Sequence, residues 1–91
     1  MAVSFSERIK VAPEVLFRVV GEEGVLVNLT TERYLGLDPV GTRMWNVLGR
    51  ASSIQAAYDE LLQEYDVEPE QLRADLEEFI DQLLGQNLIE T

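Results

Sequence analysis

Apolar residues in the first half of the chain follow the spacing of short β-strands. Three runs have this character: residues 15–20, 25–29 and 33–37. They are rich in β-branched and aromatic side chains, and polar segments that contain Gly or Thr separate them. In the second run, Val25, Val27 and Leu29 share one face. Two short connections between three strands predict an antiparallel meander, which needs a covering layer to be stable.

The second half of the chain has apolar residues three and four positions apart, as in amphipathic helices. Three stripes show this spacing: Val40, Met44, Trp45 and Leu48; Ile54, Ala57, Tyr58, Leu61, Leu62 and Tyr65; and Leu72, Leu76, Phe79, Ile80, Leu83 and Leu84. The sequence therefore predicts three helices after the sheet.

Polar residues and glycines predict where these helices begin and end. Asp38, which a proline follows, is typical of the residue before a helix, and Gly49 is expected to end that first helix. Ser52 or Ser53 is expected to cap the second helix. Gly85 is expected to form the C-cap of the third.

These elements predict one small α+β domain, a three-stranded antiparallel meander followed by three helices. Residues 1–14 show no clear periodicity and are expected to form an N-terminal arm ahead of a single domain at residues 15–91. Helices packed on a small sheet also resemble a winged helix, a topology that often binds DNA. A nucleic-acid-binding regulator is therefore one hypothesis for the function.

Charge is divided unevenly along the chain. The sequence has 7 Lys and Arg against 17 Asp and Glu, a net charge of −10. Residues 1–50 carry six basic and six acidic side chains, whereas residues 51–91 carry one basic and eleven acidic ones. The acidic excess opposes binding to a phosphate backbone, which Lys and Arg dominate. It leaves two interpretations of the acidic half, a solvated helical surface or a surface that attracts a basic peptide or protein.

The chain contains no cysteine and no histidine. Thiolate nucleophiles, disulfides, histidine-based catalytic triads and the usual zinc ligands are therefore excluded. Acidic residues gather at positions 75–81, but without an organised loop of oxygen ligands they do not predict a metal site. We expect no catalytic residue, no metal and no cofactor, and hence a protein that is not an enzyme. No membrane span and no signal peptide are predicted, so a cytoplasmic protein without a membrane partner is expected.

Several passages together carry a pattern that is more specific than any of them alone: residues 24–37, 37–48, 53–55, 65–67, 75–83 and 87–89. The second passage carries Leu37, Gly41, Met44, Trp45 and Leu48 at a characteristic spacing. From Val15 to Ile89 the sequence resembles the pyrroloquinoline-quinone synthesis protein D family, whose fold is the recognition element for ribosomally made and modified peptides. These five residues match the pattern of that family, in which an Asn is usual at the position of Asp38.

This resemblance implies a binding function. Members of the family bind the leader segment of a precursor peptide and present its core to a modifying enzyme. Stand-alone members of about this length work with a leader peptidase in lasso-peptide pathways, and others work with radical SAM enzymes in quinone-cofactor synthesis. In the family, the leader adds as a strand to the free edge of the third strand, in the groove against the third helix.

An edge strand offers unpaired N–H and C=O groups to a peptide that adds to the sheet. This argument and the resemblance predict twelve peptide-binding residues: Glu32, Arg33, Tyr34, Leu35, Gly36, Leu37, Leu72, Asp75, Leu76, Glu78, Phe79 and Gln82. On the third helix, the apolar members are expected to form a wall and the polar members to bind Lys or Arg side chains of the leader. Core positions for Leu76 and Phe79, and a core or sheet-face position for Tyr34, are the alternatives.

The leading hypothesis is thus a leader-peptide-binding adaptor, with the leader peptidase of a lasso-peptide pathway as the favoured partner. A peptide chaperone that works with a radical SAM enzyme in quinone synthesis is the alternative within the family. A winged-helix regulator and an acidic structural subunit are alternatives from other classes. The regulator is disfavoured because the third helix presents Arg73 and a row of acidic residues, which DNA would repel.

Overall fold

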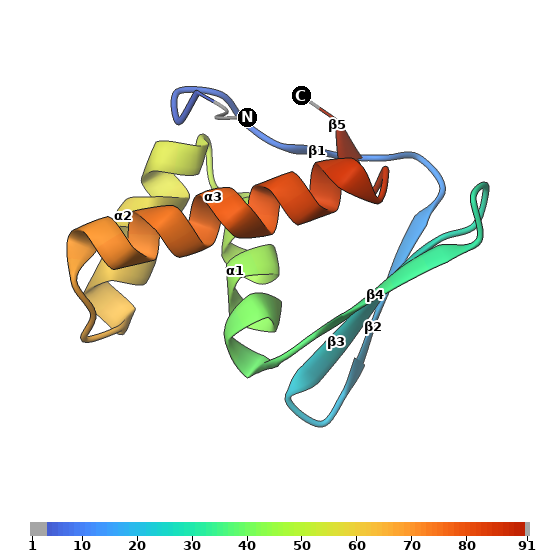
Figure 1. Ribbon diagram of the computed structural model, residues 1–91, viewed down its shortest axis with the longest axis horizontal. Coiled ribbons are helices and arrows are strands. Elements are labelled where there is room, and N and C mark those ends of the chain that lie inside the picture. The colour runs from blue at the N-terminus through green and yellow to red at the C-terminus, as the bar shows by residue number, and fades with distance from the viewer. Residues whose placement is uncertain (1–3, 91) are drawn as a thin grey trace.

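The computed structural model describes residues 4–90 of the chain, which form a small sheet and three helices (Figure 1). The elements are β1 (Lys10–Val11), β2 (Val15–Val20), β3 (Glu23–Asn28), β4 (Arg33–Leu37), α1 (Pro39–Arg50), α2 (Ile54–Glu64), α3 (Pro69–Gly85) and β5 (Ile89–Glu90). Residues 1–3 and 91, which belong to the predicted arm and domain, lie outside the described residues.

The central sheet is the predicted antiparallel meander, in the order β2-β3-β4. Val15 pairs with Asn28 at one end of the first ladder, and Gly24 pairs with Leu37 at one end of the second. The predicted α+β class, with a three-stranded sheet followed by three helices, is confirmed. Because β3 lies between the other two strands, β2 and β4 are the edges of this sheet.

The two faces of the sheet differ in their surroundings. On the inner face, Leu26 is fully buried, and Phe17 beside it packs on Trp45 of α1, with ring centroids 6.0 Å apart. Val25 and Val27 do share a face, as predicted, but it is the outer face, away from α1. The outer face comprises Leu16, Arg18, Val20, Val25, Val27, Tyr34 and Gly36. The buried positions of β3 are the alternate ones, including the polar Asn28.

Both predicted N-terminal helix caps are confirmed, and two predicted helix ends are wrong. The Asp38 carboxylate accepts a hydrogen bond from the Gly41 N–H at 2.7 Å, and Ser53, not Ser52, caps α2. The helix α1 continues one residue beyond Gly49. Gly85 is the last residue of α3 and not its cap, because the left-handed turn after the helix is made by Asn87, with φ of 58°.

The N-terminal segment is part of the packed structure. Phe5 and Ile9 are buried in the core, and β1 pairs antiparallel with β5. The Phe5 ring contacts the Tyr58 ring edge-on at 6.0 Å, and the Arg73 guanidinium lies 4.0 Å from its centroid. Residues before the first long strand therefore tie the two ends of the fold together.

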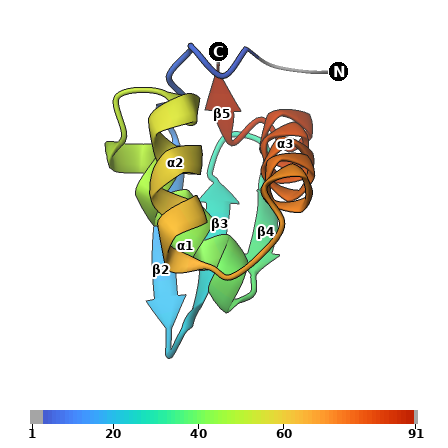
Figure 2. The same cartoon turned by 90° about the vertical axis from the view of Figure 1, so that its left-hand side faces the viewer.

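One continuous core joins the sheet, the helices and the two terminal strands. Its fully buried large side chains are Leu26, Val47, Ile54, Leu61, Leu76, Ile80, Leu83 and Leu88. The helix α1 packs against β3, β4 and α2, and α2 packs against α3. In Figure 2, α3 stands on the side of β4 and α2 on the side of β2, with α1 between them. No helix within residues 4–90 has the length and hydropathy needed to cross a membrane.

Replacing Asn28 by Ala is expected to destabilise the fold. The Asn28 side-chain oxygen accepts hydrogen bonds from the Thr30 and Thr31 N–H groups, and its amide donates to the Asn87 carbonyl at 2.6 Å. Losing these partly buried bonds costs about 2 kcal/mol, which lowers Tm by roughly 8–16 °C in a domain of this size. A thermal melt followed by circular dichroism measures the change. The control Asn46→Ala, on the exposed face of α1, should shift Tm by no more than a few degrees, and equal losses in both variants would contradict the role of Asn28.

Candidate functional site

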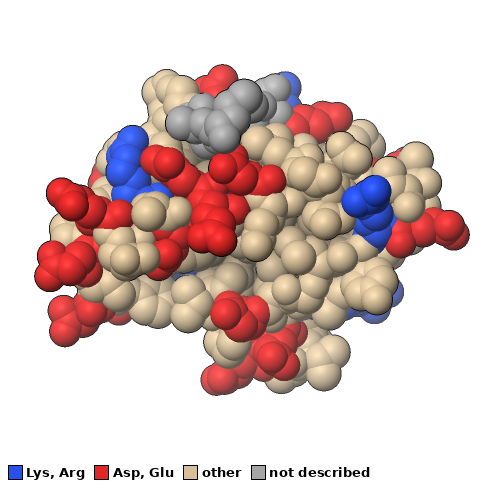
Figure 3. All heavy atoms as spheres, in the orientation of Figure 1, with Lys and Arg blue, Asp and Glu red and all other residues tan. Residues whose placement is uncertain are grey.

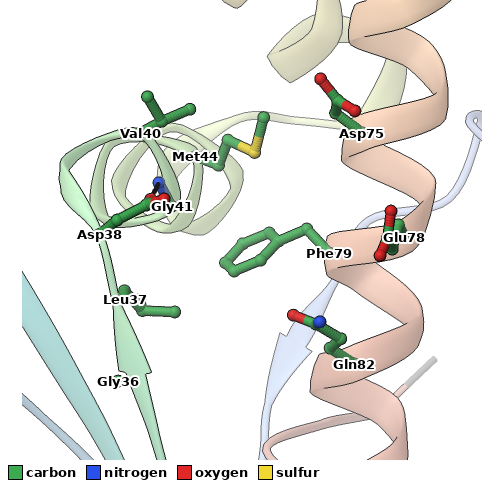
Figure 4. A pocket seen from close by; sticks show the side chains of 10 residues that line it. All are labelled: Gly36, Leu37, Asp38, Val40, Gly41, Met44, Asp75, Glu78, Phe79 and Gln82. Carbon is green, nitrogen blue, oxygen red and sulfur yellow. Dashed lines mark hydrogen bonds between the residues drawn. The ribbon is translucent and has the colours of Figure 1, made fainter.

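A groove of about 320 Å³ lies between β4, the first turns of α1, and α3 (Figure 4). Its lining residues are Gly36, Leu37, Asp38, Val40, Gly41, Met44, Asp75, Glu78, Phe79 and Gln82. The groove forms because α3 packs against α2 and β5, whereas β4 has a neighbouring strand, β3, on one side only.

The backbone of β4 is open toward this groove at alternate residues. The Leu29 N–H donates to the Glu14 carbonyl at 2.8 Å, which sets the alternation of bonded pairs between β2 and β3. The other residues of β3 then bond to β4, in pairs such as Leu26 with Leu35. The N–H and C=O groups of Tyr34 and Gly36 consequently point away from β3, to the free edge. A peptide that adds to the sheet can bond to both residues.

Apolar side chains form the floor of the groove. Figure 4 shows Leu37 of β4, Met44 of α1 and Phe79 of α3 directed toward one another across it. Each of the three is largely buried, so the floor is rigidly packed from below. This floor suits an apolar side chain of a bound peptide.

A contact between α1 and the sheet holds this floor in place. The Thr42 hydroxyl accepts a buried hydrogen bond from the Gly24 N–H at 2.8 Å. A Cβ atom at Gly24 would lie 2.6 Å from the Phe17 ring, so glycine is needed for this close approach. The first turn of α1 is thereby fixed beside the end of β4.

Carboxylates line one end and the middle of the groove. Asp38 and Asp75 lie near α1, Glu78 lies on α3 at the level of Phe79, and Gln82 lies nearer Gly36 (Figure 4). The Asp75 carboxylate accepts a hydrogen bond from the Gln71 amide at 2.8 Å. Beyond the Gln82 end, an Arg33 N–H donates to the Gln86 side chain at 3.5 Å across the groove. The groove is therefore acidic at one end and carries a cation at the other.

Among the described residues, Glu60, Glu64 and Glu77 of the helices form salt bridges with arginine side chains. Glu64 accepts a hydrogen bond from Arg43 Nε at 2.8 Å, and Glu60 lies in salt bridges with Arg43 and Arg50. The hydrogen bond from Arg43 lowers the pKa of the Glu64 carboxyl and raises the pKa of Arg43. No salt bridge between described residues involves Asp75 or Glu78. Figure 3 shows acidic side chains gathered over the helices, whereas much of the surface over the sheet is uncharged.

The structure brings half of the twelve predicted residues to the groove: Gly36, Leu37, Asp75, Glu78, Phe79 and Gln82. The other half lies elsewhere. Leu72 and Leu76 are buried in the core, and Leu35 packs against the core from the inner face of β4. Tyr34 is 73% exposed on the outer face, so only its backbone can serve the groove. Arg33 lies at the far end, and Glu32 lies in the preceding turn with φ of 59°.

The sequence-based prediction omitted four groove residues: Asp38, Val40, Gly41 and Met44. All four belong to the start of α1. The sequence could have indicated these residues, because only Asp38 separates β4 from α1. The first turns of the helix must therefore lie at the end of that strand. Among the described residues, no group of acidic side chains is arranged to hold a metal ion.

Two comparisons with known proteins gave matches. The model of the family described as Coenzyme PQQ synthesis protein D (PqqD) matches residues 23–89, a span that includes both walls of the groove. A solved structure, TbiB1 in complex with the TbiA(beta) leader peptide, has 32% sequence identity and a TM-score of 0.82. The alignment covers 89% of this chain and 94% of that chain. A comparison with curated proteins gave no match.

Proposed function

Because the chain belongs to the coenzyme PQQ synthesis protein D family, we propose that it binds the leader segment of a precursor peptide in the groove between β4 and α3. The observation that carries this proposal is the open edge of β4 beside an apolar floor. The Tyr34 and Gly36 backbone groups face this edge, and Phe79 lies opposite on α3. The similarity to a protein solved with a leader peptide supports the same ligand class.

In this proposal the leader binds as a fourth strand of the central sheet. Its backbone bonds to Tyr34 and Gly36, which supplies affinity that depends little on sequence. Alternate side chains then face the groove, where Leu37, Met44 and Phe79 select the apolar ones. Selectivity therefore rests on the groove floor and rim.

We further propose that the chain delivers the bound leader to a processing enzyme and does no chemistry itself. A leader is a segment that is removed, so a peptidase must act on the same precursor. The leader peptidase of a lasso-peptide pathway is the favoured partner. The absence of histidine and cysteine fits a protein that holds a peptide while another protein reacts with it.

A role in quinone synthesis is the second candidate, because the matching family is described by that pathway. The partner would then be a radical SAM enzyme. Neighbouring genes separate the two candidates: a peptidase and an asparagine-synthetase-like cyclase indicate lasso-peptide synthesis, and a radical enzyme beside quinone-synthesis genes indicates the other.

Titration with the leader of a precursor encoded beside this chain tests the proposal. Fluorescence anisotropy of the labelled leader should show saturable binding. A leader of the same composition in scrambled order should bind much more weakly, because its side chains no longer match the groove. Equal binding of the two peptides, or preferential binding of duplex DNA at physiological salt, would overturn the proposed function.

A further inference from the structure

We infer that the bound peptide carries an apolar residue in the groove and a Lys or Arg two positions away, on the side of α1 only. This inference rests on the proposed function and adds the sequence pattern that the groove selects. It follows from three features: the alternation of β4, the spacing of side chains on α3, and the unequal charge at the two ends of the groove.

The alternation of β4 determines which peptide residues enter the groove. In a paired strand, opposite residues share a face. Tyr34 and Gly36 belong to the outer face, so peptide residues opposite them also point outward. Peptide residues opposite Leu35 and Leu37 point inward, toward α3. The residue opposite Leu37 faces the apolar floor, and the next inward residue lies two positions along the peptide.

The spacing of side chains on α3 matches this step. Two residues of a strand advance by about 6.8 Å, and one turn of a helix advances by about 5.4 Å. Asp75 precedes Phe79 by four residues, so it lies about one turn away, and Figure 4 shows it at the α1 end of the groove. An inward residue two positions from the apolar one, toward α1, therefore comes near Asp75 and the carboxylate of Asp38.

The charges at this end favour a cation. Asp38 and Asp75 line the groove at this end, and Glu78 lines it one residue before Phe79. Neither Asp75 nor Glu78 is in a salt bridge among the described residues. At the other end, the neutral Gln82 and the cation Arg33 offer no attraction for a second positive charge. The preference for Lys or Arg should thus be one-sided. If the peptide is antiparallel to β4, the cation precedes the apolar residue, and if it is parallel, the cation follows it.

Selection from a displayed library of random twelve-residue peptides tests the inference without knowledge of the natural ligand. The selected peptides should share an apolar residue and, at only one of the two positions flanking it at a distance of two, Lys or Arg. For a selected peptide, Lys→Gln at that position should weaken binding about three- to tenfold at low salt, and much less at 0.5 M salt. The same change two positions away on the other side should have little effect.

A double variant, Asp75→Asn with Glu78→Gln, provides the decisive comparison. It should retain selection for the apolar residue and lose the preference for a cation. A control double variant, Asp66→Asn with Glu70→Gln, removes the same two negative charges at exposed positions that do not line the groove, and it should keep the preference. Circular dichroism confirms that each variant is folded.

The outcomes separate this inference from the function on which it rests. Selected peptides with cations on both sides, or a preference unchanged in the double variant, would attribute the effect to the overall charge of −10 and overturn the inference alone. Selected peptides with no cation preference would overturn it as well. A failure to select any peptide that competes with the candidate leader would overturn the proposed groove.

Discussion

Replacing Gly36 by Pro is expected to remove leader binding while leaving the domain folded. The Gly36 N–H points to the free edge of β4, so proline breaks no bond to β3 there. A Cβ atom at this position would meet no atom within 4 Å, and the Cδ atom of the ring takes the place of the N–H at the free edge. An added strand, however, loses its hydrogen-bond donor and meets the ring in its place.

The expected loss is large because proline acts on the backbone that carries the affinity. One lost bond and the displaced neighbouring bonds amount to at least about 2 kcal/mol, or roughly 30-fold in Kd. Anisotropy titration of the labelled leader measures it. The variant Gly36→Ala, which keeps the N–H, should bind nearly as well as the original chain.

The other edge of the sheet supplies a matched control. Val19 of β2 also directs its N–H away from β3, so Val19→Pro makes the same backbone change at the edge remote from α3. Leader binding should be unchanged in this variant. Loss of binding in Val19→Pro but not in Gly36→Pro would place the peptide on β2 and contradict the proposed groove.

Replacing Leu76 by Ala is expected to cause the largest loss of stability. Leu76 lies on the inner face of α3 and is fully buried in the core that joins the helices to the sheet. A cavity of this kind costs about 2–5 kcal/mol, a large part of the roughly 5–14 kcal/mol expected for a chain of this length. The corresponding fall in Tm is about 8–40 °C, which a thermal melt measures.

Two comparisons test whether Leu76 contributes to stability or to peptide binding. Leu16→Ala makes the same chemical change at a side chain that is 44% exposed on the outer face, and it should cost less than about 1 kcal/mol. At a temperature where Leu76→Ala remains folded, its leader affinity should stay near that of the original chain. A selective loss of affinity with little change in Tm would instead place Leu76 in the binding surface.

The regular elements were predictable from local patterns. The bounds of β2 and β4 match the predicted runs, because β-branched and aromatic residues are concentrated there. The caps Asp38 and Ser53 were predictable from hydrogen-bonding chemistry that involves only neighbouring residues. The end of α3 was not, because the left-handed position fell on Asn87 and not on Gly85.

The groove was only partly predictable, for reasons of geometry. The periodicity of α3 shows which face of the helix is apolar. It does not show that Phe79 on this face lines the groove whereas Leu76 is fully buried in the core. The orientation of β3 was also hidden. The alternation placed Val25 and Val27 on one face without indicating which face is covered, and in the structure Leu26 and Asn28 face inward. Such choices depend on tertiary packing.

If a leader binds β4 as proposed, the exposed outer face affects how precursor sequences can evolve. An added strand would place every second side chain beside Tyr34, in the row that continues through Val27 to Leu16, and no helix covers that row among the described residues. Positions of one parity would then be constrained by affinity for this groove. Positions of the other parity would remain free to change with whichever enzyme approaches. A precursor family could thus change its outward-facing residues under selection for a new enzyme, while its inward-facing residues continue to bind the same groove.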